Sequence, residues 1–147
     1  TNELWIAEVK SGKIQKNQKD ASSAAVGLIN TAKNDLKMRL NDTNTSLWLN
    51  ALNAAKVFMS DNNNQKEVVM KLLGQCADDA EENNSSNSFN VVLSATLFHN
   101  ISERMEAARI EKKYFRIIGE KLFKKVFIMI IQKETFEAVF DFLESEG

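Results

Sequence analysis

The chain has 147 residues, enough for one domain with a sizeable hydrophobic core. Its hydrophobic fraction of 44% and charged fraction of 27% are those of an ordinary globular protein, and the net charge of -1 excludes a wholly basic nucleic-acid-binding protein. The charge is unevenly distributed: residues 1–60 carry eight Lys and Arg against five Asp and Glu, whereas residues 61–88 carry two against six. We therefore expect a polyanionic partner, if there is one, near the N-terminal third.

The scarcity of cysteine and histidine excludes further classes. Cys76 is the only cysteine, so the chain has no internal disulfide, and together with His99 it cannot supply the four ligands of a structural zinc site. His99 is interpreted as an ordinary histidine at a strand end or on the surface. The longest apolar run, residues 126–131, is too short to span a bilayer. We expect a cytoplasmic protein without a membrane partner.

The first predicted element is a strand in the stretch LWIAEVKSGK, residues 4–13. Side chains alternate between the two faces of a strand, so Ile6, Glu8 and Lys10 share one face. An acid and a base are thus expected side by side at the end of an otherwise apolar strand. Such a pair is either a surface ion pair or one half of a metal-dependent active site.

Three helices are predicted next. Apolar residues recur at three- and four-residue steps over residues 15–40, which indicates an amphipathic helix. A second helix carries Leu49, Leu52, Ala55 and Met59. Trp48 of the same helix is expected in the hydrophobic core of the protein rather than at a contact surface. A third helix carries Val69, Leu72, Leu73, Cys76 and Ala80. We interpret residues 41–88 as a helical insertion.

The second half of the chain predicts strands separated by a helix. Residues 89–98, FNVVLSATLF, are rich in β-branched and aromatic residues and predict a strand. A helix from about 101 to 123 follows, and then VFIMII, typical of a strand covered on both faces. Residues 133–145 predict a closing helix with Phe136, Val139, Phe140 and Leu143 facing inward. The predicted fold is α/β, a single domain over residues 1–147 with a small mixed or parallel sheet flanked by helices in the order β-ααα-β-α-β-α.

The triplet Glu8-Val9-Lys10 is the strongest candidate for chemistry. Phosphodiester cleavage needs charge stabilisation and a nucleophilic water. The Glu8 carboxylate and the Val9 carbonyl can offer oxygen ligands to Mg²⁺ or Mn²⁺. Lys10, on the same face as Glu8, can orient or deprotonate the water and oppose the phosphate charge.

This triplet resembles the (D/E)-x-K half of the PD-(D/E)XK nuclease superfamily. The order of LWIAEVK, helices, NVVLSATLF, helix and KVFIMII is similar to the second half of that restriction-endonuclease-like fold, with a weaker likeness to the nuclease component of Hachiman-type anti-phage systems. The resemblance implies a metal-dependent nuclease that cuts DNA in bacterial defence or restriction, with Glu8 and Lys10 catalytic and a second defence-system subunit as a partner. The family's first acid lies on a strand upstream of the triplet, so we expect this chain to be either part of a longer protein or a truncated or degenerate member of the family.

Two sets of basic residues are candidates for contact with the DNA backbone. Lys13, Lys16 and Lys19 follow Lys10 at every third position and would grip phosphates without reading bases. A solvated lysine face is the other interpretation of this set. A second set could form another rim of the same groove or a plain helix face: Lys112, Lys113, Arg116, Lys121, Lys124 and Lys125.

Two hypotheses follow from these patterns. The first is a metal-dependent DNA nuclease domain. The second is a non-catalytic α/β interaction domain in which Glu8 and Lys10 are a structural ion pair. The nuclease hypothesis requires the Glu8 carboxylate to lie at an open cleft near a second acid.

Overall fold

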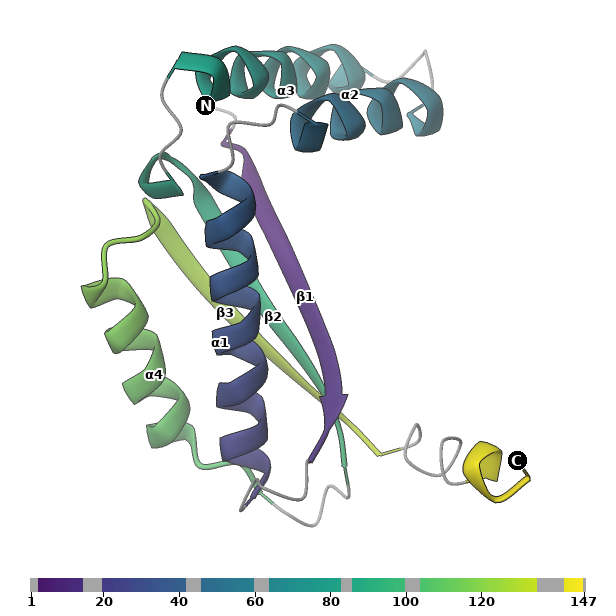
Figure 1. Ribbon diagram of the computed structural model, residues 1–147, viewed down its shortest axis with the longest axis vertical. Coiled ribbons are helices and arrows are strands. Elements are labelled where there is room, and N and C mark those ends of the chain that lie inside the picture. Colours follow the sequence, from purple (N-terminus) through teal and green to yellow (C-terminus); the bar gives the residue numbers. More distant parts are fainter. Residues whose placement is uncertain are drawn as a thin grey trace. The chain divides into compact units, whose positions relative to one another are not determined.

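The computed structural model describes residues 3–14, 20–41, 46–59, 64–82, 86–99, 104–134 and 142–146 (Figure 1). In chain order the elements are β1 (Trp5–Lys13), α1 (Ala21–Leu40), α2 (Ser46–Phe58), α3 (Asn64–Glu82), a 3-10 turn (Ser86–Ser88), β2 (Asn90–Phe98), α4 (Ala107–Gly119) and β3 (Lys125–Lys133), with residues 142–146 also helical. The strands form one parallel sheet, so the predicted α/β class is confirmed.

The chain divides into two compact units. The first comprises residues 1–36 and 87–147, and the second comprises residues 37–86. In the second unit α2 packs against α3, and Trp48 and Leu73 are buried. Trp48 is 5% exposed, which confirms that it is a core residue. The sheet, α4 and most of α1 belong to the first unit, which also holds the residues predicted to carry chemistry.

The sheet has the order β1-β2-β3, with β2 in the centre. Its register pairs Glu8 with Leu93 and Leu93 with Ile128. A connection between neighbouring parallel strands is almost always right-handed, so two successive connections in the same direction lie on the same face of the sheet. Accordingly, α1 and α4 lie side by side over one face (Figure 1).

The core of the first unit lies between this face and α1. Four side chains of β2 point toward the helices and are fully buried: Val91, Leu93, Ala95 and Leu97. Leu97 packs into a cluster with the small residues Ala21, Ala24 and Ala25 of α1. Because alanines leave room for the strand, the first turns of α1 lie close against the sheet.

On the opposite face of the sheet, side chains of the two edge strands are exposed in the described part of the chain, whereas Ser94 of the central strand is buried. Val9 is 60% exposed, Phe127 55% and Met129 42%. The prediction that residues 126–131 are covered on both faces is therefore wrong for the described residues. In β3, exposed and half-buried side chains alternate along the strand. Every residue in the run 126–131 is apolar, so the sequence does not show which side chains face outward.

The helix ends differ from the predicted ranges. The helix expected over about 101–123 is observed as Ala107–Gly119 and is followed by Lys121 at φ 52°, in the left-handed conformation that commonly ends helices. The helix expected from residue 15 is observed from Ala21, while residues 15–19 lie outside the described residues. Phe136, Val139 and Phe140 also lie outside them. Leu143, expected to face inward, is 59% exposed.

We predict that Leu97→Ala lowers the free energy of unfolding by about 2 to 5 kcal/mol, because it removes a fully buried side chain from a tightly packed cluster. The matched control is Leu49→Ala in α2, where the leucine is 48% exposed and the expected cost is about 1 kcal/mol or less. Urea titrations followed by circular dichroism measure both. Equal losses would contradict the assignment of Leu97 to the core.

Candidate active site

Glu8 and Lys10 lie in the middle of β1 and not at its end. The strand continues to Lys13, three residues beyond the expected end. Glu8 and Lys10 share the helix-covered face of the sheet, as the alternation predicts, because Glu8 is paired with Leu93 and Lys10 with Ala95. The position of the pair at a strand end is therefore corrected, and its placement on one face is retained.

Lys10 bridges two carboxylates that come from different elements. Its Nζ lies 2.9 Å from Oε1 of Glu8 on the same strand. The same Nζ lies 2.6 Å from Oδ2 of Asp35 on α1. Asp35 is thus a second acid beside the triplet, which the nuclease hypothesis requires. We call Glu8, Lys10 and Asp35 the carboxylate–lysine cluster.

The cluster is buried at one end and accessible at the other. The Glu8 side chain is 8% exposed, whereas the side chains of Lys10 and Asp35 are 24% and 31% exposed. A solute can therefore reach the cluster from the side of Lys10 and Asp35, with Glu8 at its inner end. With both carboxylates ionised and the amine protonated, the cluster carries one net negative charge and favours a further cation.

Both carboxylates stabilise the charged form of Lys10. The pKa of Lys10 is raised above its ordinary value of 10.5, chiefly by the hydrogen bond to Asp35 and then by the one to Glu8, while burial acts in the opposite direction. Lys10 is therefore a firmly held cation in this arrangement and not a neutral base.

Asp35 was not identified from the sequence. It is the only acid in α1, but nothing in the spacing of the helix links it to a lysine on β1. The contact arises because Asp35 lies on the flank of α1 that faces β1. On that flank, Leu28 lies close to Gly12, where an added Cβ would approach the leucine to 3.2 Å.

The other predicted site residues are placed as follows. The Val9 side chain is on the opposite face of the sheet from Glu8, and a role for its carbonyl as a metal ligand stays a prediction. Lys13 belongs to β1 and not to a helix, so alternation puts it on the face opposite Lys10. It lies 3.5 Å from Glu144, with its side chain half exposed. Lys16 and Lys19 lie outside the described residues.

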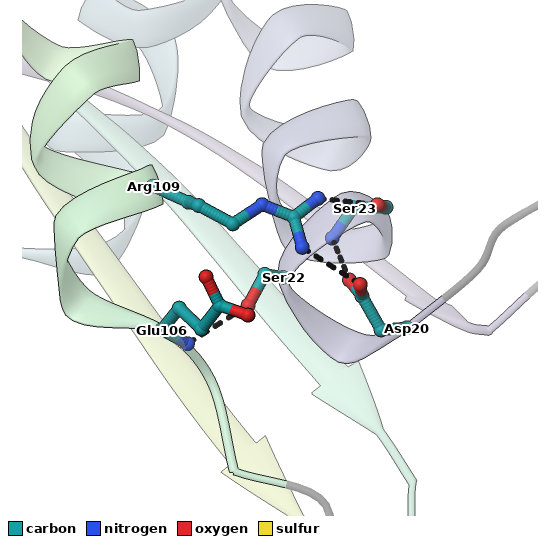
Figure 2. A network of polar contacts seen from close by, with 5 residues as sticks. All are labelled: Asp20, Ser22, Ser23, Glu106 and Arg109. Atoms are coloured by element: carbon teal, nitrogen blue, oxygen red, sulfur yellow. Dashed lines mark hydrogen bonds and ion pairs between the residues drawn. The ribbon is translucent and has the colours of Figure 1, made fainter.

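Polar side chains join α1 to α4 at the first turns of the two helices. Asp20 caps α1 by accepting a hydrogen bond from the Ser23 backbone N–H, at 2.7 Å. Arg109 of α4 donates to Asp20 at 2.7 Å and to the Ser23 hydroxyl at 2.6 Å, and the Glu106 backbone N–H donates to Ser22 (Figure 2). The pKa of Asp20 is lowered by the Ser23 backbone hydrogen bond and then by Arg109. These contacts fix the first turns of the two helices against each other.

Further along the two helices, the polar contacts continue. Lys113 donates to Asn30 at 2.8 Å, and Lys33 pairs with Glu120 at 2.7 Å. A groove of about 660 Å³ runs over this contact, lined from α1 by Ser23, Val26, Gly27 and Asn30 and from α4 by Arg109, Lys112, Lys113 and Arg116.

The second basic set of the sequence does not form one surface. Lys112, Lys113 and Arg116 line the groove between α1 and α4. Lys121, Lys124 and Lys125 line a separate hollow beside Phe123 and Val126. The expectation that all six form a single rim is therefore wrong.

His99 is buried at the end of β2, in contrast to the surface position considered from the sequence. It is 2% exposed, and its backbone N–H donates to the carbonyl of Lys133. Within the described part of the chain, neither ring nitrogen has a hydrogen-bond partner.

No protein-family model, no curated protein and no solved structure matches the chain. Among the described residues, no three His, Cys, Asp or Glu side chains are grouped to hold a metal ion, so the two carboxylates of the carboxylate–lysine cluster are the oxygen donors to consider. No helix in the described ranges is both long and apolar enough to cross a membrane.

We predict that Lys10→Met lowers the urea midpoint at neutral pH, because it leaves the Glu8 and Asp35 carboxylates together without the ammonium between them. Lys13→Met is the matched control and should cost less, because Lys13 pairs with Glu144 on an exposed surface.

The pH dependence of this difference has a defined sign. Because folding raises the pKa of Lys10, its contribution is complete below pH 10.5 and is lost as the pH rises through the raised value. The wild type should therefore lose its advantage over Lys10→Met as the pH rises through that alkaline range. Equal urea midpoints for the Lys10 and Lys13 variants at neutral pH would show that Lys10 is an ordinary surface residue.

Proposed function

We propose that the chain is a metal-dependent nuclease domain that hydrolyses phosphodiester bonds in DNA, with the carboxylate–lysine cluster as its active site. The observation that carries this proposal is the position of Lys10, whose Nζ contacts Glu8 on β1 and Asp35 on α1. An E-x-K triplet alone is common. A second acid, brought from another element to the same lysine, gives the triplet the composition of a metal and phosphate site.

The donor set suits the proposed ion. Mg²⁺ prefers oxygen ligands and is usually bound in proteins by one or two carboxylates together with water and substrate phosphates. Glu8 and Asp35 would hold Mg²⁺ or Mn²⁺ here, with the Val9 carbonyl as a further proposed ligand. The net negative charge of the cluster favours the ion, and the partial exposure of Asp35 gives it a path of entry.

The residues of the chain then have distinct roles. Such an ion, when bound, supplies a Lewis acid for the phosphate and lowers the pKa of a water molecule. Glu8, held at the buried end of the cluster, would fix the position of the metal ion relative to the sheet. Lys10 is a cation at the more exposed end, where it can oppose the negative charge that develops on the phosphate or hold the attacking water.

The resemblance to the PD-(D/E)XK superfamily supports the same proposal. On that interpretation β1 carries the E-x-K triplet, and the order of strands and helices corresponds to the second half of a restriction-endonuclease-like fold. A role in anti-phage defence or restriction, with a second subunit as a partner, is part of the proposal.

A second candidate function is favoured by the burial of Glu8. The residue is 6% exposed, and the Nζ of Lys10 already lies against both carboxylates. These observations are also those of a structural ion pair in a non-catalytic α/β interaction domain. In that case a metal ion would not displace Lys10 from the two carboxylates. The chain would bind a partner without cutting nucleic acid.

We predict that the full-length native protein cuts plasmid and linear DNA with Mg²⁺ or Mn²⁺ at low salt, and that Glu8→Gln lowers the rate at least about 100-fold. Asp35→Asn should also lower it, because it removes the second carboxylate. Gel assays of initial rates measure these effects. Glu67→Gln and Asp78→Asn, two exposed acids of α3, are matched controls and should leave the rate unchanged.

Folding of each variant is checked by circular dichroism and by its urea midpoint. If the folded, full-length protein cuts nothing with either metal, or if cutting survives Glu8→Gln, the nuclease proposal fails in favour of the interaction domain.

A further inference from the structure

We propose that the groove between α1 and α4 is a binding surface for the phosphate backbone of a nucleic acid, separate from the carboxylate–lysine cluster. The preference for phosphate follows from the groove's own residues. The choice of a nucleic acid among polyanions rests on the proposed nuclease function.

The positive charges of the groove lie in one row on α4. Lys112 and Lys113 are adjacent, and each is three or four residues from Arg109 and from Arg116, so all four lie on one side of the helix. Glu111 is directed elsewhere, because it lines a different hollow beside Met105 and Ile130. No acid is among the residues that line the groove in the described part of the chain.

Two of these four cations have partners and two do not. Arg109 is paired with Asp20, and Lys113 donates to the neutral side chain of Asn30. The side chains of Lys112 and Arg116 are exposed and have no hydrogen-bond or ion-pair partner among the described residues. The groove therefore keeps an excess of positive charge that the residues described by the structure do not neutralise.

The cations also repel one another. Burial lowers the pKa of Lys113 most, and the nearby charge of Lys33 lowers it further, whereas Glu120 raises it and Arg116 has the smallest lowering effect. A bound anion would relieve this repulsion. The Ser23 hydroxyl and the Asn30 amide, on the α1 side, add groups that can hydrogen-bond to phosphate oxygens.

The length of the row fits several phosphates and not one. Seven residues of helix separate Arg109 from Arg116, a distance of about 10 Å at 1.5 Å per residue. A straight stretch of this length exceeds one phosphate group, so the cations can contact more than one phosphate of a backbone. A linear polyanion matches this arrangement better than a single small anion does.

The groove and the cluster lie on different flanks of α1. Asp35 is on the flank that contacts β1, whereas Ser23 and Asn30 face α4. Substitutions in the groove therefore leave the cluster intact, and the two proposals can fail separately.

The test is equilibrium binding of the full-length protein to fluorescein-labelled 20-nucleotide DNA and RNA, single-stranded and duplex, by fluorescence anisotropy. EDTA is present throughout, so that no metal-dependent cleavage occurs. The groove variant is Lys112→Gln/Arg116→Gln. The control, Lys56→Gln/Lys71→Gln, makes the same change of charge at exposed positions of α2 and α3.

We expect the groove variant to bind duplex DNA about tenfold or more weakly than wild type, with the slope of log K against log salt shallower by about 2. The control should bind like wild type.

The possible outcomes separate the two proposals. If the groove variant binds DNA and RNA like the control, or if wild type binds neither, the groove proposal is wrong, whatever the cleavage assay shows. Binding of poly-glutamate but not of nucleic acid, lost in the same variant, would overturn the assignment to nucleic acid. If binding is lost as expected while Glu8→Gln cuts normally, the groove is supported and the active-site proposal fails.

Discussion

The parallel pairing of β1, β2 and β3 in sequence order is the constraint on which the first unit depends. Right-handed connections put α1 and α4 on the same face of such a sheet. One flank of α1 then lies against β1, where Asp35 meets Lys10, and the other lies against α4, where the basic groove forms. Both proposed sites are consequences of one topology.

The two proposed sites carry net charges of opposite sign. At the carboxylate–lysine cluster one ammonium faces two carboxylates, and the excess charge is negative. Between α1 and α4, Asp20 and Glu120 neutralise only part of the basic charge, and the excess is positive. Under the proposed function, the first site would hold a metal ion and the second would bind phosphates of the chain that is cut.

Local patterns in the sequence predicted the parts of this structure that depend on neighbouring residues. Alternation in LWIAEVK placed Glu8 and Lys10 on one face, and the β-branched run at β2 predicted the central strand. The partnership of Lys10 with Asp35 was not predictable, because it depends on how α1 crosses β1 and not on any spacing in the chain. The groove was only partly foreseen for the same reason: Lys112 and Arg116 were identified as basic, but Ser23 and Asn30 come from another helix.

The errors have equally local causes. In VFIMII every side chain is apolar, so the sequence does not distinguish the covered face from the exposed face that carries Phe127 and Met129. The third-residue spacing of Lys10 and Lys13 suggested a common surface, but both residues belong to β1, where that spacing leads to opposite faces. Periodicity is informative only once the type of element is known.

The most direct test of the account is an anomalous difference map from crystals of the full-length protein soaked in Mn²⁺. The account predicts a peak between Glu8 and Asp35, at about 2.1 Å from an oxygen of each, with the Lys10 ammonium displaced from at least one carboxylate. Lys10 still bridging both carboxylates, with no metal between them, would contradict the proposed active site and identify the cluster as a structural ion pair.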